Sequence, residues 1–194
     1  MAILPIKLYG DPVLRERALP VSVIDDDLRR LAADMGETMY AAAGIGLAAN
    51  QIGELRRILV IDVDQMTTGA DGKRGPRDPQ ARRLQVFLNA EITAASDDDG
   101  DYDEGCLSIP DVESTVYRPN SVRVRYRTLE GEDREGWFSG MTARVLQHEI
   151  DHLDGVLFVD RIAAEARSAL AGKLARIRRG EVPSAVDELL KQGT

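Results

Sequence analysis

Apolar residues recur at helical spacing in three stretches of the chain. Residues 25–40, 141–154 and 163–180 each place hydrophobic side chains three or four positions apart, as one face of an α-helix does. In the first stretch these side chains are Leu28, Leu31, Met35 and Met39. The second stretch ends at Gly155, a residue suited to terminate a helix. We therefore expect three helices.

Strand patterns separate these helices. Residues 55–63 and 84–93 are apolar runs typical of buried strands, whereas 121–128 alternates apolar residues with arginines. A turn then makes 135–139 the expected hairpin partner. Three Gly and two Pro within 65–83 predict an exposed, mobile loop. This order predicts an α+β fold with mixed or antiparallel β-sheets packed around a central helix, and a further helix at the C-terminus.

Composition narrows the class of protein. The chain has 194 residues, of which 43% are hydrophobic and 30% are charged, the balance of one globular domain. No apolar run approaches the roughly 20 residues of a membrane span, and the first residues lack the order of a signal peptide. We therefore expect a cytoplasmic protein without membrane contact. The net charge of −8 argues against binding nucleic acid over the whole surface. The single cysteine, Cys106, excludes an internal disulfide.

An H-E-x-x-H pattern lies inside the second predicted helix, at His148, Glu149 and His152. Four residues advance about 6 Å along a helix, so both imidazoles project from one face and can share a cation. Glu149 stands beside them, where it can accept a proton from water. The alternative is that the two histidines are chance neighbours in the core. The chain has only two histidines, which makes this spacing an improbable accident.

The third metal ligand is not given by this pattern. A catalytic metal site usually has three protein ligands and one open position. Some metalloproteases supply a third histidine six positions after the second, where this chain has Phe158. Asp154 and Asp160 are available, but Cys106 offers a soft thiolate in a distinctive segment. A lone cysteine is more often a small buried hydrophobe, so Cys106 is favoured only because the histidine pair lacks a partner.

Three blocks together resemble the peptide deformylase family: GIGLAANQ at 44–51, EGCLS at 104–108 and QHEIDHLDG at 147–155. They occur in the family's order, and the resemblance spans about residues 3–162. It implies a catalytic domain over 1–162, with a helical tail over 163–194 packed on or extending from the same domain. The implied reaction is metal-dependent hydrolysis of the N-formyl group from the methionine that starts new polypeptides, with release of formate.

The resemblance also implies roles for individual residues. The implied metal ligands are Cys106, His148 and His152. Glu149 matches the general acid and base. Gln51 and the backbone N–H of Leu107 match the groups that stabilise the oxyanion. On simple grounds two histidines and a cysteine suit Zn²⁺, but the resemblance implies Fe²⁺ as the native ion, with Zn²⁺, Ni²⁺ or Co²⁺ able to substitute.

Further implied residues hold the substrate or the ligands. Ile45, Gly46 and Val145 match positions that bind the peptide, the first two as a strand edge that pairs with it. Glu104 is expected to hold a ligand or a neighbouring loop. Against this role stands a run of acidic residues before Glu104, which is typical of a solvated loop. These residues are Asp97, Asp98, Asp99, Asp101 and Asp103.

The stretch 163–180 carries five basic residues against one acidic residue on an otherwise acidic chain. An ordinary amphipathic helix with solvated arginines explains this contrast, and docking to ribosomal RNA is the alternative hypothesis, because the implied substrate is a nascent chain. Two other functions compete with deformylation. One is an unrelated zinc peptidase that cleaves internal bonds. The other is a non-catalytic module with a structural metal, which would usually need four protein ligands.

Overall fold

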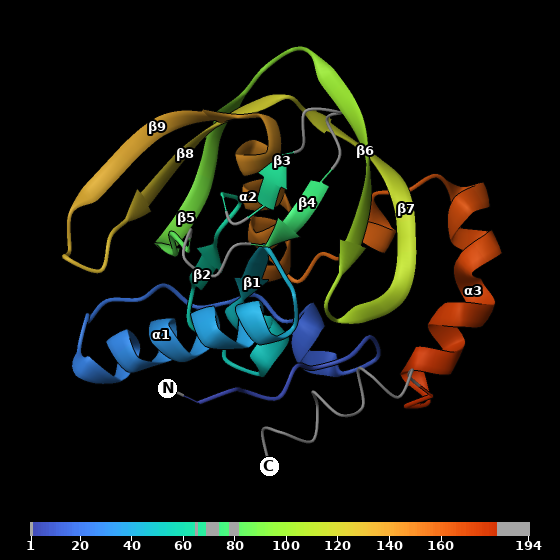
Figure 1. The fold of residues 1–194 in the computed structure, drawn as a ribbon, viewed down its shortest axis with the longest axis horizontal. Coiled ribbons are helices and arrows are strands. Elements are labelled where there is room, and N and C mark those ends of the chain that lie inside the picture. Colours follow the sequence, from blue (N-terminus) through green and yellow to red (C-terminus); the bar gives the residue numbers. More distant parts are fainter. Residues whose placement is uncertain (1, 65, 69–73, 78–81, 182–194) are drawn as a thin grey trace.

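The computed structural model describes residues 2–64, 66–68, 74–77 and 82–181 (Figure 1). A five-stranded sheet crosses the molecule in the order β1-β2-β5-β8-β9, and each neighbouring pair is antiparallel. Its strands are β1 (Gly46–Ala48), β2 (Ile58–Ile61), β5 (Gln85–Ala95), β8 (Ser121–Arg127) and β9 (Asp133–Ser139). The four strands expected from the sequence are confirmed, and the sheet is antiparallel rather than mixed.

The three expected helices are also present: α1 (Asp26–Ala41), α2 (Gly140–Leu153) and α3 (Ala164–Arg178). The carboxylate of Asp25 caps α1 by accepting the backbone N–H of Leu28 at 2.8 Å. Among the described residues, no helix is both long and apolar enough to cross a membrane. Short 3-10 helices lie at Pro12–Arg15, Ala49–Ile52 and Phe158–Asp160.

A second antiparallel pair, β6 (Asp99–Cys106) and β7 (Ile109–Pro119), replaces the solvated loop that the acidic run suggested. Asp99, Asp101 and Asp103 are exposed on β6, which pairs with β7 along its length, so these three residues of the acidic run lie in a strand, whereas Asp97 and Asp98 precede it. The composition of 97–104 alone could not predict this strand, because the strand depends on its pairing with β7.

The insertion between β2 and β5 also contains paired backbone. Short strands β3 (Met66–Thr68) and β4 (Arg74–Arg77) form a two-stranded sheet, so these residues of the expected exposed loop are paired strands. The predicted mobility of the remainder of 65–83 falls largely on residues 65, 69–73 and 78–81, which lie outside the described residues.

Helix α2 lies between the five-stranded sheet and the β6–β7 pair, whereas α1 packs on the other side of the sheet and α3 lies along β7 (Figure 1). Eleven of the 14 residues of α2 are buried. Its apolar side chains pack with β2, β5 and β8, and α3 contributes Leu174 and Ile177 to a separate cluster with β7. The polar residues of α2 therefore lie in the interior, where each needs a partner or a function.

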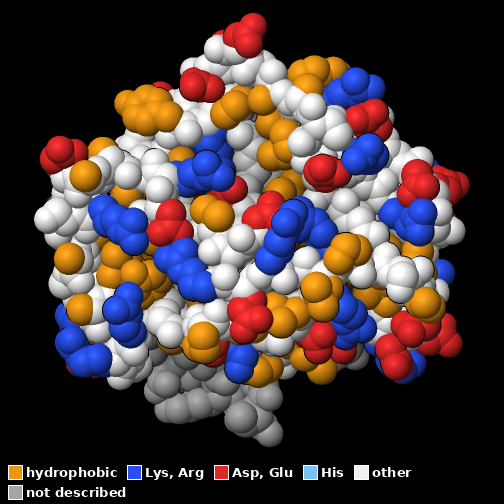
Figure 2. Space-filling model, turned by 180° about the vertical axis from the view of Figure 1, so that it is seen from behind, with side chains coloured by type: hydrophobic (Ala, Val, Ile, Leu, Met, Phe, Trp, Pro, Cys, Tyr) orange, Lys and Arg blue, Asp and Glu red, His pale blue; other side chains and the backbone are white. Residues whose placement is uncertain are grey.

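On the face seen from behind, basic and acidic side chains are intermixed (Figure 2).

Candidate metal centre and cleft

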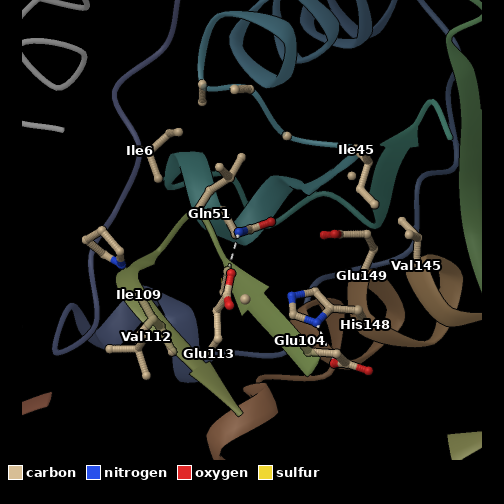
Figure 3. A pocket seen from close by; sticks show the side chains of 18 of the residues that line it. Ile6, Ile45, Gln51, Glu104, Ile109, Val112, Glu113, Val145, His148 and Glu149 are labelled. Carbon is tan, nitrogen blue, oxygen red and sulfur yellow. Dashed lines mark hydrogen bonds and ion pairs between the residues drawn. The ribbon is translucent and has the colours of Figure 1, made fainter. Parts of the chain in front are cut away.

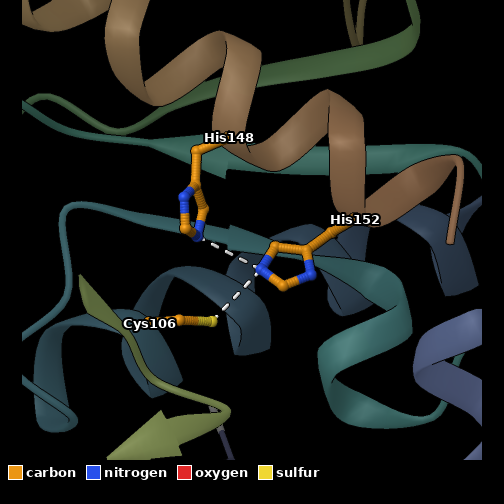
Figure 4. A group of neighbouring side chains, drawn as sticks. All are labelled: Cys106, His148 and His152. Carbon is orange, nitrogen blue, oxygen red and sulfur yellow. Dashed lines mark hydrogen bonds between the residues drawn. The ribbon is translucent and has the colours of Figure 1, made fainter. Parts of the chain in front are cut away.

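The side chains of Cys106, His148 and His152 converge between α2 and the end of β6 (Figure 4). The Nε2 atom of His152 lies 3.2 Å from Cys106 Sγ and 3.2 Å from His148 Nε2. Two donors bound to one ion at 2.0–2.3 Å lie roughly 3.5 Å apart, so this cluster has the dimensions of a metal site. Across the part of the chain that the structure describes, no other group of three or more acidic, Cys and His side chains is placed to hold an ion.

His148 is held by Glu104 of β6. His148 Nδ1 donates to Glu104 Oε2 at 3.0 Å, which leaves the Nε2 lone pair facing the cluster. Glu104 also accepts two bonds from Arg118, at 2.7 and 3.0 Å, and one from Arg144 at 3.2 Å. Burial alone would raise the pKa of Glu104, but the hydrogen bonds from His148 and Arg118 outweigh burial and lower this pKa to about 2. Glu104 is therefore ionised at neutral pH, where it accepts the hydrogen bond of His148.

A buried arginine behind Glu104, Arg118, is not among the site residues predicted from the sequence. Arg118 donates through Nη1 to Asp151 of α2 at 2.7 Å, and Asp151 also accepts from Arg161. The signal was present in the alternation of β7, because Val116 and Arg118 share its buried face. An arginine at a buried strand position requires carboxylate partners, and these partners connect the ligand-bearing helix to β6 and β7.

Glu149 lies between the metal-capable cluster and β1. Its side chain is buried, and Oε2 has no hydrogen-bond partner among the described residues. Burial raises the pKa of Glu149 to about 7. Gly46 of β1 faces this carboxylate so closely that a Cβ at position 46 would lie 2.9 Å from Glu149 Cδ. A buried carboxylate with a free oxygen is suited to exchange a proton with a bound molecule.

Gln51 is oriented by its neighbours. Its Oε1 accepts the backbone N–H of Ala48 at 2.8 Å, so the amide nitrogen must point the other way. That nitrogen lies 3.3 Å from Ser108 Oγ and 3.5 Å from Cys106 Sγ. Ser108, which is buried, is a further residue that the sequence analysis did not assign. The N–H donors of Gln51 are thereby aimed at the same point as the metal-capable cluster.

These groups open into one cleft of about 860 Å³ (Figure 3). Its walls include nine of the ten site residues expected from the sequence, while His152 lies behind them: the nine are Ile45, Gly46, Gln51, Glu104, Cys106, Leu107, Val145, His148 and Glu149. The cleft also has walls that the sequence analysis missed, from the N-terminal segment, β7 and α3: Ile3, Leu4, Ile6, Asp111, Glu113 and Lys173. The N-terminal segment is apolar, whereas β7 contributes carboxylates.

This site combines the two histidines of a helical H-E-x-x-H pattern with a cysteine sulfur from a neighbouring strand, and a cleft lies beside them. These features define a metallohydrolase. The polypeptide deformylase family model matches residues 3–168, so the chain belongs to this family. Its members are metal-dependent enzymes that remove the formyl group from newly made polypeptides.

Individual relatives agree in sequence and in structure. A peptide deformylase of Zymomonas mobilis is 44% identical over 179 residues, which are 92% of this chain and 97% of that relative. The structure of peptide deformylase from Thermus thermophilus is similar with a TM-score of 0.79 and 40% identity, covering 91% of this chain and 98% of the other. A plant peptide deformylase structure has a TM-score of 0.81 at 33% identity, covering 91% and 90%.

Proposed function

We propose that this chain deformylates formyl-methionyl peptides with Cys106, His148 and His152 as the three ligands of a single divalent cation. The observation that carries the proposal is the buried carboxylate of Glu149, whose Oε2 has no hydrogen-bond partner among the described residues and which lines the same cleft as Cys106 and His148. A thiolate with two imidazoles suits Zn²⁺ and Fe²⁺ alike, and we propose Fe²⁺ as the native ion. When bound, the cation supplies Lewis-acid activation of water and of the formyl oxygen.

Glu149 moves the proton in this proposal. It accepts a proton from the attacking water molecule and delivers it to the leaving nitrogen of the peptide, so that formate and a free amine are released. The apolar side chains of α2 fix the position of the helix that carries Glu149, and the unpartnered Oε2 is the proposed site of the proton.

The negative charge that develops on the formyl oxygen requires N–H donors. Gln51 Nε2 and the backbone N–H of Leu107 are the proposed donors, each worth roughly 3 kcal/mol in a preorganised site. The Ala48 N–H keeps Gln51 in the orientation that this role needs. Leu107 lies in the connection after Cys106 and lines the same cleft.

The peptide is proposed to lie along the β1 edge. β1 pairs with β2 on one side, through Gly46 and Ile61 among others, and the cleft lies against Ile45 and Gly46. An extended substrate can add to such an edge by backbone hydrogen bonds. Val145 of α2 then contacts the substrate beside Glu149, and Glu104 keeps His148 oriented as a ligand.

The test is an anaerobic assay of Glu149→Gln on formyl-Met-Ala, beside acetyl-Met-Ala. The variant should keep its metal and lose about 10²-fold or more of kcat, because it cannot carry the proton. Glu165→Gln, the same change on the exposed surface of α3, is the matched control and should be fully active. Near-normal turnover by Glu149→Gln would refute the assigned acid and base. Iron content after anaerobic purification tests the native ion.

We also propose that the protein acts in the cytoplasm, where ribosomes release formylated chains, and that α3 contacts the ribosome. Arg176 in the last turn of α3 and Arg179 directly after the helix are exposed, and both form surface ion pairs with Glu181. Co-sedimentation with ribosomes should weaken with salt and with the double change Arg176→Glu and Arg179→Glu. Unchanged co-sedimentation of this variant would remove the ribosome contact from the proposal.

A further inference from the structure

The outer wall of the cleft carries carboxylates that the proposed mechanism does not use. Asp111 and Glu113 of β7 line the cleft, and both are exposed. Within the described part of the chain, neither forms a hydrogen bond or an ion pair through its side chain. Their charges are therefore available to a bound molecule.

The other charged groups of the cleft wall do not cancel this charge. Arg144 is committed to Glu104 and to two backbone carbonyls, and Asp103 accepts a hydrogen bond from Thr115. Lys173 of α3 is the one cation of the wall without a side-chain partner among the described residues. Two free carboxylates against one ammonium leave this part of the cleft with an excess of negative charge.

Glu113 carries part of this negative charge close to the end of the cleft at which the metal-capable cluster lies. Glu113 lies opposite Gly105, the neighbour of Cys106, and a Cβ at Gly105 would lie 3.4 Å from Glu113 Cγ. Adjacent strands are roughly 5 Å apart and an extended peptide advances about 3.3 Å per residue. A carboxylate one strand away from the metal-capable cluster is therefore within reach of the residues that follow the formylated methionine. The unpartnered Glu149 Oε2 independently marks the inner end of this cleft as a place for a ligand.

We propose that Asp111 and Glu113 are specificity residues that favour nascent chains with lysine or arginine at the first or second position after the methionine. This inference rests on the proposed function and names its preferred substrates. The attraction acts across a solvent-exposed wall, so it is modest per carboxylate and sensitive to salt. The positive charge of Lys173 repels a basic substrate side chain, but one ammonium limits the preference set by two carboxylates and does not reverse it.

The test measures kcat/KM of the metal-loaded full chain on four peptides with amidated C-termini: formyl-Met-Lys-Ala, formyl-Met-Ala-Lys, formyl-Met-Glu-Ala and formyl-Met-Ala-Glu. The variant carries Asp111→Asn and Glu113→Gln. Asparagine suits position 111 because Asp111 has a positive φ of 58°. The matched control is Asp101→Asn, which removes a charge from the exposed surface of β6 outside the cleft.

The wild type and Asp101→Asn should prefer the lysine peptides, and the double variant should reduce the Lys-to-Glu ratio about two- to tenfold. Salt near 0.5 M should reduce the wild-type ratio similarly, because the Debye length falls to about 4 Å. Equal rates on all four peptides in the wild type, or an unchanged ratio in the double variant, would overturn the specificity role while leaving deformylation intact. Failure to deformylate any peptide would instead overturn the proposed function and this inference together.

Discussion

A methyl group added at Gly46 should disable the enzyme without unfolding it. Gly46 lies on β1 opposite α2, and its missing side chain leaves room for the carboxylate of Glu149. In Gly46→Ala the new Cβ would lie 2.7 Å from Val145 Cγ1 and 2.9 Å from Glu149 Cδ, and nearer still to Glu149 Oε1. Glu149 and Val145 must therefore move away from β1.

The size of the effect follows from these distances. Non-bonded carbon atoms settle at about 3.5 Å or more, so the two contacts are short by roughly 0.6 to 0.8 Å. A misplacement near 1 Å at a reacting group costs about 10²-fold in rate. Overpacking of this kind costs about 1–3 kcal/mol of unfolding free energy, which a protein of this size can tolerate. We expect a folded variant whose kcat on formyl-Met-Ala is reduced about 10²-fold.

The assay compares kcat, KM, metal content and the unfolding midpoint of Gly46→Ala with those of Gly136→Ala. Gly136 on β9 has nothing within 4 Å of an added Cβ, so this control makes the same chemical change without a clash. Gly46→Ala should keep its metal and lose kcat, and the control should behave as the wild type does. A normal kcat with only a raised KM would refute the reasoning, because it would show that the methyl group crowds the substrate and leaves Glu149 in place.

Three further predictions address the ligands and the ion pairs. Cys106→Ser should retain much less metal after dialysis, because it removes the sulfur that lies 3.2 Å from His152 Nε2, and metal analysis that finds full occupancy would exclude Cys106 as a ligand. Arg118→Met should lower the unfolding free energy by about 3–5 kcal/mol in denaturant titrations, because it removes the buried cation that Glu104 and Asp151 share. A loss below about 1 kcal/mol would show that the remaining partners, Arg144 and His148 for Glu104 and Arg161 for Asp151, are sufficient. Asp160 forms an ion pair with Arg15. Partial burial acts to raise the pKa of Asp160, but the hydrogen bond from Arg15 outweighs burial, so this pKa is lowered from its ordinary value of 3.8. The stabilisation is therefore present above pH 3.8 and is lost as the pH falls below that value. Asp160→Asn should accordingly be less stable than the wild type at neutral pH, and the difference should shrink on acidification; a difference that is constant with pH would contradict the ion-pair explanation.

The helices could be predicted because their information is local. The spacing of Leu28, Leu31 and Met35 places them on one face, and these side chains are buried in α1 as expected. The strand β6 could not be predicted in this way. Asp99, Asp101 and Asp103 all remain exposed on it, and the strand exists because β7 supplies its backbone partners from residues further along the chain.

The candidate site also combines residues that a local pattern predicts with residues that only long-range packing brings together. The pair His148 and His152 is a pattern within one helix, whereas the approach of Cys106 depends on how β6 is packed against α2. The resemblance to a family supplied that long-range contact, which spacing alone could not. Arg118 was not predicted because an arginine in a strand is ordinarily expected on the solvent-exposed face, whereas here it is buried and pairs with Glu104 and with Asp151 of α2.

The burial of α2 also constrains how this protein can vary over generations. A catalytic group on a surface loop can be exchanged while the interior stays as it is. Here Glu149, His148 and His152 are themselves part of the interior, flanked on the same helix by Leu146, Ile150 and Leu153. Inherited substitutions that retune the reaction must therefore also preserve the shape of the core, whereas changes to the outer wall of the cleft meet no such demand. Divergence among descendants of this chain should accumulate at the mouth of the cleft, in which peptides they accept, and much more slowly in the bond they break.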